Sequence, residues 1–171
     1  MYYISASDVA AIIGKNPYKT EDEVRRKVTK SGPSPDEIAE EQLSELTPEV
    51  REHVHKVLDV SKKSETSSSD AQKLIEDGLQ GVQNEVVKEY IVRKVSTQHG
   101  INNEAKTAKE FQVRSDETFY KYQLTDDVRL VGRIDGRLET DDETIVEIKN
   151  RRNRLFNKIP EYEMVQIHVY M

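Results

Sequence analysis

Alternating apolar and polar positions mark two extended segments in the last third of the chain. In the first segment, one row of side chains is apolar and consists of Leu130, Ile134 and Leu138. The opposite row is mainly charged and consists of Val131, Arg133, Asp135 and Arg137. In the second segment, Glu147 and Lys149 share one face. A period of two predicts two strands, and the polar residues 140–142 predict the turn that joins them into a hairpin.

The register of this hairpin decides where its charged side chains meet. With a three-residue loop, Glu139 faces Glu143, and Asp135 lies directly across from Glu147. Two carboxylates about 5 Å apart repel each other unless a positive charge lies between them. Oxygen ligands without thiolates favour magnesium or manganese, so the hairpin predicts a divalent-cation site beside Lys149. The alternative is a solvated strand face with a cross-strand salt bridge.

The spacing of Glu147 and Lys149 is informative only in its context. In a chain that is 34% charged, a glutamate two residues before a lysine is common, and a second copy occurs at Glu104 and Lys106. Glu147 and Lys149 lie in the β-branched run IVEIK, where charge is unusual, whereas Glu104 lies in a helical pattern. The hairpin copy is therefore the better candidate for a site.

Helix-start signals dominate the region between residues 20 and 95. The capping patterns begin at Thr20, Ser34, Thr47 and Ser69. The polar stretch SKKSETSSSD, residues 61–70, predicts a flexible linker or an exposed loop. Beyond it, the apolar residues of 74–95 predict a helix or a helix pair, interrupted near Gly78 and Gly81. We expect several helices here, with scaffolding or partner contact as their role.

The N-terminal segment predicts one further, short helix. Ser5 and Asp8 have the spacing of a capping box, and apolar residues follow them. Gly14 then fits a C-terminal stop, because glycine readily takes the left-handed conformation that ends many helices.

The composition excludes several classes of protein. The 171 residues carry a net charge of −6, which argues against a protein that coats nucleic acid over its whole surface. Cysteine is absent, so disulfides, thiolate zinc sites and iron–sulfur clusters are excluded. No apolar run approaches the length of a membrane span, and the N-terminal residues lack a signal-peptide pattern. We expect an intracellular protein, in the cytoplasm or in the nucleus of a host cell.

One basic run interrupts the otherwise acidic sequence. Residues 149–158, KNRRNRLFNK, contain five basic residues and no acidic one. Directly beyond the predicted strand that carries Glu147, Arg151, Arg152 and Arg154 would contact DNA phosphates without reading bases. The alternative is a solvated charged loop, which is the usual meaning of such a run.

Five short motifs occur in a recognisable order. They read SASDVAAIIGKNPY near the start, then GINNEAKTAKEF, GRIDG, IVEIKN and finally YEMVQIHVYM. In this order the chain resembles the YqaJ-like viral recombinase family. That family is the lambda-exonuclease-type branch of the PD-(D/E)XK nucleases and is also similar to the alkaline nucleases of large DNA viruses. The resemblance skips roughly residues 20–95.

The resemblance implies a role for each candidate residue. Asp135 and Glu147 match the metal-binding carboxylates, with the main-chain carbonyl of Ile148 as a further ligand. Lys149 matches the catalytic lysine. From the flanking helices, Glu104 matches an acid that helps order the metal site, and Gln166 matches a glutamine that steadies it. Two alternatives stay open: Glu104 could only stabilise a helix start near residues 102–103, and Gln166 could be a surface amide.

The resemblance also assigns a function to the N-terminal helix. Ser7 matches a serine that, in lambda-type exonucleases, helps hold the terminal 5′-phosphate near a helix N-terminus. Those enzymes carry an arginine several residues earlier, and this chain begins after that position. The polarity of an exonuclease activity is therefore left open.

The implied fold is mixed α+β, with a restriction-endonuclease-like αβββα(β) core over residues 100–171. A helix with Glu104, three strands and a helix after Pro160 account for this core, and its final strand is missing. We expect a fragment truncated at the C-terminus, or else a partner or N-terminal element that covers the open sheet edge. Residues 1–99 form the predicted helical N-terminal region, with the end-binding motif and a charged helical insertion.

These observations together predict a DNA nuclease that uses Mg²⁺ or Mn²⁺ to hydrolyse phosphodiester bonds in viral or phage recombination or repair. Exonuclease action is expected, and endonuclease action on branched or nicked DNA is an alternative. A further alternative is a DNA-binding or assembly module that keeps the nuclease fold without turnover. The resemblance implies a single-strand annealing protein as a partner, and a homo-oligomer is also considered.

Overall fold

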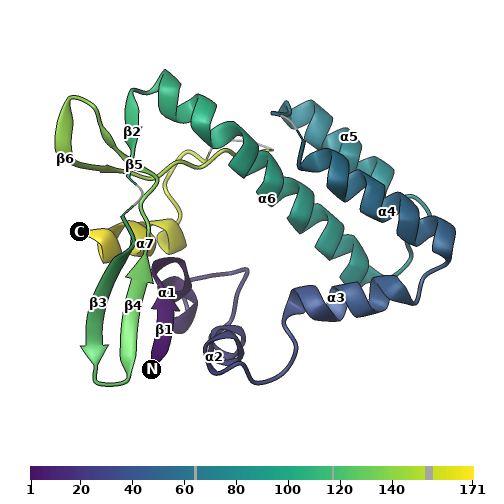
Figure 1. The fold of residues 1–171 in the computed structure, drawn as a ribbon, viewed down its shortest axis with the longest axis horizontal. Coiled ribbons are helices and arrows are strands. Elements are labelled where there is room, and N and C mark those ends of the chain that lie inside the picture. Colours follow the sequence, from purple (N-terminus) through teal and green to yellow (C-terminus); the bar gives the residue numbers. More distant parts are fainter. Residues whose placement is uncertain (64, 117, 153–155) are drawn as a thin grey trace. The chain divides into compact units, whose positions relative to one another are not determined.

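The computed structural model describes residues 1–63, 65–116, 118–152 and 156–171, and its fold is mixed α+β, as predicted (Figure 1). The chain forms two compact units. The first, here called the sheet unit, comprises Met1–Gly32, Ala108–Ile148 and Phe156–Met171. The second, the helical unit, comprises Pro33–Thr107 and Lys149–Leu155. This division differs from the predicted one between residues 99 and 100.

The sheet unit contains two three-stranded sheets. In the first, β4 (Val128–Gly132) lies between β1 (Tyr2–Ser5), which is parallel to it, and β3 (Tyr120–Thr125), which is antiparallel. In the second, β5 (Gly136–Leu138) lies between β2 (Val113–Ser115) and β6 (Asp141–Val146), both antiparallel to it.

Three helices complete the sheet unit. They are α1 (Ala6–Ile12), α2 (Glu21–Thr29) and α7 (Glu161–Tyr170). Helix α1 packs against α7 and also contacts β1, β4 and α2. The predicted stop of α1 is confirmed, because the helix ends at Ile12 and Gly14 has a φ of +70°. The helix after Pro160 is confirmed as well.

The segment predicted as one strand from residue 130 to 138 is two strands in two different sheets. A glycine ends β4 and another begins β5, and at each of them another part of the chain comes close. A Cβ atom on Gly132 would lie 2.6 Å from Cε1 of Tyr170, and one on Gly136 would lie 2.5 Å from Cγ1 of Val113. The apolar and charged rows continue across the break, so alternation alone could not reveal it.

The turn of the β5–β6 hairpin also differs from the prediction. Gly136 pairs with Val146 and Arg137 with Ile145, but the register then shifts and Leu138 pairs with Asp141. The turn therefore lies at residues 139–140, and the predicted pair of Glu139 with Glu143 does not form. The irregularity on β6 absorbs the extra residues, as bulges do, and leaves the other end of the ladder in the predicted register.

Two short strands, β1 and β2, escape the sequence analysis. They have four and three residues, which is too few for a period of two to stand out. Strand β1 pairs with β4 from Tyr2 to Ser5. Strand β1 thus covers one edge of β4.

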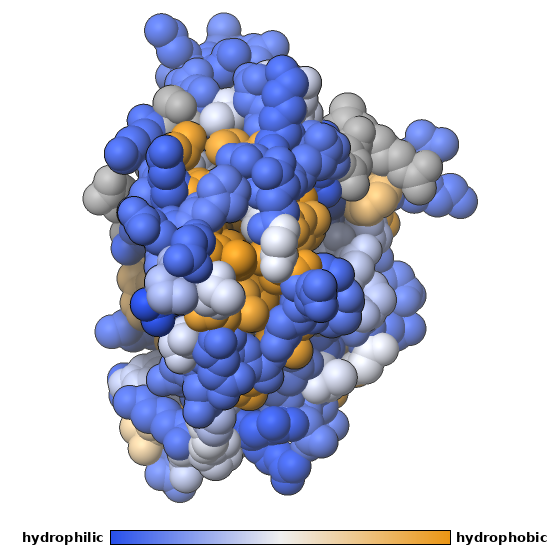
Figure 2. Space-filling view, turned by 90° about the vertical axis from the view of Figure 1, so that its right-hand side faces the viewer, coloured by the Kyte–Doolittle hydropathy of each residue, from blue (hydrophilic) through white to orange (hydrophobic). Residues whose placement is uncertain are grey.

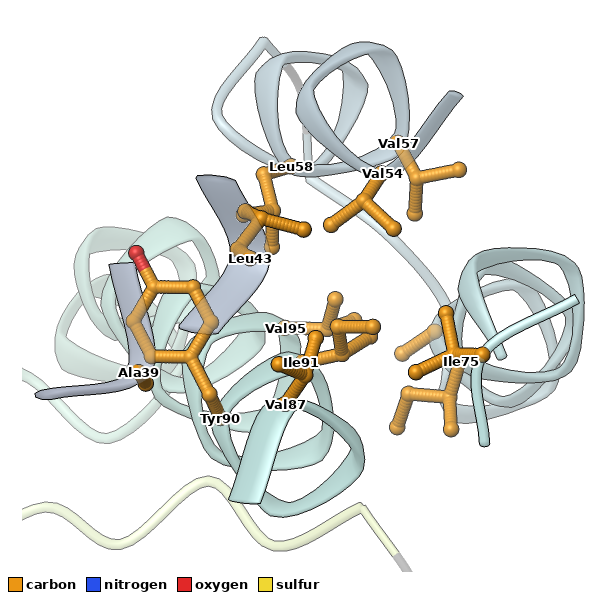
Figure 3. Close-up of a cluster of buried hydrophobic side chains, with 12 residues drawn as sticks. Ala39, Leu43, Val54, Val57, Leu58, Ile75, Val87, Tyr90, Ile91 and Val95 are labelled. Atoms are coloured by element: carbon orange, nitrogen blue, oxygen red, sulfur yellow. The ribbon is translucent and has the colours of Figure 1, made fainter. Parts of the chain in front are cut away.

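The helical unit contains α3 (Pro35–Ser44), α4 (Pro48–Ser61), α5 (Ser68–Gly78) and most of α6 (Glu85–Glu110). Apolar side chains from all four helices point toward one another and form its core (Figure 3). Leu43, Val54, Val87 and Ile91 are completely inaccessible to solvent. Burying one such aliphatic side chain contributes roughly 1.5–3 kcal/mol, so this cluster is the main source of stability for the unit.

Most of the predicted helix starts are confirmed. Thr20 and Ser34 form complete capping boxes with Glu23 and Glu37, and α4 begins with Pro48 at its first turn. The fourth start is wrong by two residues, because the cap of α5 is Ser67, whose hydroxyl accepts from the Asp70 amide. The predicted linker 61–70 is correspondingly shorter: Ser61 ends α4, and residues 68–70 belong to α5.

Helix α6 runs without interruption through the predicted boundary at residues 99 and 100. Glycine in a helix interior costs only about 1 kcal/mol relative to alanine. The buried residues Val87, Tyr90, Ile91 and Val95 hold this helix against the core, so Gly100 does not end it. The alternative that Glu104 caps a helix start near residues 102–103 is therefore wrong.

Hydrophilic side chains dominate the surface in the space-filling view, with apolar side chains visible between them in the middle of one face (Figure 2). None of the helices in the described part of the chain is both long enough and apolar enough to cross a membrane.

Candidate active site

Asp135 and Glu147 lie at the same end of the β5–β6 ladder. Gly136 pairs with Val146, and continuing this antiparallel register by one residue sets Asp135 opposite Glu147. Directly opposed residues project from the same face of an antiparallel pair. Both side chains are partly buried. The predicted register thus holds at this end of the hairpin, although the turn at the other end differs.

Two hydrogen bonds orient these carboxylates. The backbone N–H of Ile148 donates to Oδ2 of Asp135 at 2.5 Å, and Nε2 of Gln166 donates to Oε1 of Glu147 at 2.8 Å. Gln166 is partly buried, and its amide contacts Glu147 instead of only solvent. The structure therefore brings together Asp135, Glu147, Ile148 and Gln166 within the sheet unit.

Helix α7 contacts other segments of the sheet unit near both of its ends. Near its C-terminus, the Tyr170 hydroxyl donates to the carbonyl of Arg133 at 2.8 Å, in the segment that joins β4 to β5. At its start, Glu161 forms an ion pair with Lys15 at 3.2 Å. Tyr170 lies four residues after Gln166 and therefore projects from the same side of the helix. This attachment positions Gln166 for its contact with Glu147.

The donor set fits a hard divalent cation. It consists of two carboxylates and, one residue further on, the main-chain carbonyl of Ile148. Among the described residues no three His, Cys, Asp or Glu side chains form a group that could hold a metal ion. Magnesium commonly binds through one or two carboxylates and keeps waters and substrate phosphate oxygens as its other ligands. The residues present therefore suit magnesium or manganese.

Glu104 and Lys149, the two other predicted catalytic residues, belong to the helical unit. Glu104 is partly buried in the interior of α6, and Lys149 is exposed. Lys149 follows Ile148 directly in the chain.

Asn150 is a positioning residue that the sequence analysis did not identify. Its Nδ2 donates to the carbonyl of Gly100 at 3.2 Å, and its Oδ1 accepts from the Thr107 hydroxyl at 2.7 Å. Gly100, Glu104 and Thr107 are spaced by four and three residues, so they share one stripe of α6. The residue after Lys149 is thus fixed along the stripe that carries Glu104. Asn150 is the last residue of the IVEIKN motif. Apart from that position, the sequence does not indicate a role for it, because an amide side chain in a polar run is common.

A second polar cluster surrounds Asp8 in α1. This carboxylate is only 2% exposed, and Lys19 and Lys27 form ion pairs with it at 2.5 and 2.6 Å. The Ser5 hydroxyl donates to it at 2.5 Å. Burial raises the pKa of Asp8, but the hydrogen bonds from Lys19, Lys27 and Ser5 outweigh burial and hold that pKa below its ordinary value of 3.8.

This cluster replaces the predicted capping box. Ser5 precedes α1 as its N-cap, but its side chain accepts no bond from the helix backbone. Its hydroxyl donates to the Asp8 carboxylate instead, because two lysines hold that carboxylate in its ionised, accepting form. The spacing of Ser5 and Asp8 therefore predicted that these two residues interact. It did not predict that the Ser5 hydroxyl donates to the Asp8 carboxylate.

Ser7, the predicted phosphate-binding residue, lies beside this cluster and is exposed. Its hydroxyl is 3.2 Å from the hydroxyl of Ser5, and Nζ of Lys27 is 3.4 Å from the same Ser5 oxygen. Two lysines meet one carboxylate here, so the cluster carries an excess of positive charge. Nothing in the sequence links Lys19 and Lys27 to Ser7, since both lie in other segments.

The predicted DNA-binding arginines fall in the helical unit. The guanidinium of Arg152 donates to the amide oxygen of Gln72 in α5, and Arg151 is partly buried. Arg154 lies outside the described residues.

The chain matches the YqaJ-like viral recombinase domain over residues 2–171. The match includes residues 20–95, which the motifs do not cover. No curated protein and no solved structure matches the chain significantly. The chain therefore belongs to the YqaJ-like viral recombinase domain family, which gives it a nuclease-type role in viral DNA recombination with DNA as its substrate.

Proposed function

We propose that this protein is a Mg²⁺- or Mn²⁺-dependent deoxyribonuclease that hydrolyses phosphodiester bonds from the ends of DNA. The observation that carries the proposal is the β5–β6 register, in which Asp135 and Glu147 directly adjoin the paired residues Gly136 and Val146. Two opposed, partly buried carboxylates would repel each other and weaken the hairpin. A bound divalent cation removes that repulsion, which is a physical reason for this sequence to place both acids there.

The metal-holding groups are Asp135, Glu147 and the carbonyl of Ile148. A divalent cation bound there lowers the pKa of a coordinated water and neutralises charge that develops on the phosphate. Gln166 holds one oxygen of Glu147, and the Ile148 amide holds one oxygen of Asp135. Both carboxylates are thereby oriented before substrate binds, which reduces the reorganisation needed during the reaction.

Lys149 and Glu104 complete the proposed catalytic set. Lys149 follows the metal-binding carbonyl in the chain, and its ammonium would orient the attacking water and stabilise the added negative charge on the phosphate. Glu104 is proposed, by its match to the family motif, to help order the metal site, and Asn150 hydrogen-bonds Gly100 and Thr107 on the same stripe of α6.

The remaining assignments concern DNA contacts. Ser7, with the positive charge of Lys19 and Lys27 nearby, is proposed to bind a terminal 5′-phosphate. Arg151, Arg152 and Arg154 are proposed to contact the phosphate backbone without reading sequence.

Cleavage of linear duplex DNA in Mg²⁺ tests the proposed catalytic site. Glu147→Gln removes a ligand charge without changing the size of the side chain, and we expect the rate to fall on the order of a hundredfold or more. The matched control is Glu143→Gln, the same change at an exposed position of β6, which should leave the rate unchanged. Equal rates for both variants, or activity that persists in EDTA, would contradict the proposal.

Two further comparisons separate the remaining alternatives. An exonuclease degrades linear DNA but not a covalently closed circle, whereas an endonuclease cuts both. Ser7→Ala should lower the preference for a 5′-phosphate end over a 5′-hydroxyl end, and an unchanged ratio would remove Ser7 from the site. Calorimetric titration with Mn²⁺ identifies an inactive assembly module, which should show no metal uptake that depends on Asp135.

A further inference from the structure

A second feature of the sheet unit, a cleft lined by aromatic side chains, has no part in the proposed metal chemistry. The cleft lies between the segment after α1 and the start of α7, and its volume is about 560 Å³. This size is within the range of small-ligand sites. Three aromatic residues line it, namely Tyr18, Phe156 and Tyr162.

The local sequence presents Tyr18 to solvent. The Tyr18 amide donates to Oδ1 of Asn16 at 2.8 Å across Pro17, which fixes a tight turn. The Tyr18 ring is 77% exposed, so packing within the protein does not explain its position. A turn that holds an exposed ring in place reduces the entropy cost of binding through that ring.

The rings are arranged to accept a planar group. Tyr18 and Tyr162 meet edge to face, with centroids 5.8 Å apart and an interplanar angle of 88°. Such a pair brings only an edge and a face into contact, so the largely exposed Tyr18 ring can also stack on a third planar group. Phe156, which is 41% exposed, adds another aromatic surface to the same cleft.

The charges around the cleft are suited to a weakly anionic ligand. Lys15 lines the cleft, and its ammonium forms an ion pair with Glu161 at 3.2 Å. Both side chains are about half exposed or more. An ion pair this exposed contributes little to the stability of the protein. A phosphate can therefore compete with Glu161 for Lys15.

The cleft is close to the candidate active site along α7. Tyr162 precedes Gln166 by four residues, which is about one turn, or 5.4 Å along the helix axis. The Gln166 amide donates to Glu147. The cleft and the contact to Glu147 are therefore about one helical turn apart along α7.

We propose that this cleft stacks an unpaired base of DNA against Tyr18, Phe156 and Tyr162. Exposed aromatic rings beside a cation are the usual means of binding single strands, because every base has a face that can stack. Bases inside a duplex stack on each other, so the ligand is a single-stranded or frayed end. The position of this base near the cut rests on the proposed function, whereas base binding by the cleft does not.

The test measures binding of a fluorescently labelled single-stranded oligonucleotide by anisotropy, in EDTA so that no cleavage occurs. Tyr18→Ser should weaken binding by about tenfold, the effect of losing one base-stacking contact. Tyr18→Trp keeps an aromatic ring at this position and should bind the oligonucleotide like the wild type. The matched control is Tyr122→Ser, since Tyr122 lies in β3 of the same unit, is 70% exposed and does not line the cleft. This control should bind like the wild type.

Two further measurements distinguish a loss of base stacking from a loss of phosphate contacts and from misfolding of the variant. The slope of affinity against salt concentration should not change in Tyr18→Ser, because the variant removes no phosphate contact. An oligonucleotide with abasic positions should bind wild type and Tyr18→Ser equally. Equal binding of the normal oligonucleotide by both proteins, an equal loss in Tyr122→Ser, or a Tyr18→Ser loss that persists on the abasic strand would each overturn the proposal.

These outcomes are independent of the proposed nuclease activity. A protein that binds single strands through Tyr18 but never cuts DNA contradicts only the catalytic assignment. A protein that cuts DNA with no contribution from Tyr18 to binding contradicts only the base-stacking cleft. If the cleft instead serves an apolar peptide, Tyr18→Ser leaves oligonucleotide binding unchanged, which also overturns the proposal.

Discussion

The backbone N–H of Ile148 donates to the Asp135 carboxylate at 2.5 Å, although 13 residues separate the two. The bond joins a side chain at the start of β5 to the backbone just beyond β6. A shift of one residue in the register would move Asp135 to the opposite face and break this bond. The geometry of the candidate metal ligands therefore depends on strand pairing, and changes to that pairing should affect activity without touching a ligand.

Removing the Gln166 amide should weaken the metal site without unfolding the protein. Gln166→Leu keeps the approximate size of the side chain but loses the hydrogen bond to Glu147. Groups that orient a metal ligand typically contribute about 10- to 100-fold to metal affinity or activity. We expect a loss of this size in Mn²⁺ affinity by calorimetry and in the rate of DNA cleavage. His168→Gln, an exposed change on the same helix, is the control and should behave like the wild type.

Adding one methyl group at Gly136 should destabilise the protein, whereas adding it at Gly100 should not. A Cβ on Gly136 would lie 2.5 Å from Cγ1 of Val113 and press against the backbone carbonyl of Arg114. Overpacking of this kind costs about 1–3 kcal/mol, and here the backbone must move. On Gly100 the nearest atom is 3.9 Å away, so alanine should stabilise α6 by up to about 1 kcal/mol.

Urea unfolding of these two variants gives the free energies directly. The outcome that contradicts the structure is a Gly136→Ala protein as stable as the wild type. A Gly100→Ala protein that is strongly destabilised would instead show that α6 is not continuous through this position.

Asn150 and Thr107 should stabilise the protein as a coupled pair. Their side chains share a hydrogen bond of 2.7 Å, which ties the segment after Lys149 to α6. We expect Asn150→Ala to cost about 1–3 kcal/mol, because it removes a partner from two hydrogen bonds. A double-mutant cycle with Thr107→Val should give a coupling energy of about 0.5–1.5 kcal/mol. Additive effects would show that the two residues do not interact in solution.

The contribution of Asp8 to stability should depend on pH. Its pKa in the folded protein lies below the ordinary value of 3.8, so the ionised form is favoured by folding. That contribution is complete above the ordinary pKa and is lost as the pH falls through the lower folded-state pKa. Asp8→Asn should therefore cost about 2 kcal/mol at pH 7, and the difference from wild type should shrink below about pH 4.

Urea unfolding of both proteins between pH 7 and pH 2.5 measures this difference. Asp126→Asn, in an exposed turn, is the control and should show no comparable pH dependence. A constant difference between Asp8→Asn and wild type across this range would contradict the ion pairs with Lys19 and Lys27.

Local patterns in the sequence determined the elements whose cause is local. Thr20 and Ser34 cap their helices because the capping box is completed within three residues. Gly14 ends α1 for a similarly local reason, its left-handed backbone. The pairing of Gly136 with Val146 also followed from the sequence, because a period of two fixes which residues share a face once the register is known.

Tertiary structure decided everything that depends on chain segments far apart in sequence. The strand predicted over residues 130–138 breaks because Tyr170, Val113 and Arg114 approach its two glycines, and these residues lie in other elements. Lys19 and Lys27 gather around Asp8 only once α2 is folded against α1. Periodicity reports only how successive side chains alternate. Which distant groups meet depends on packing, and a pattern of apolar and polar residues does not contain that information.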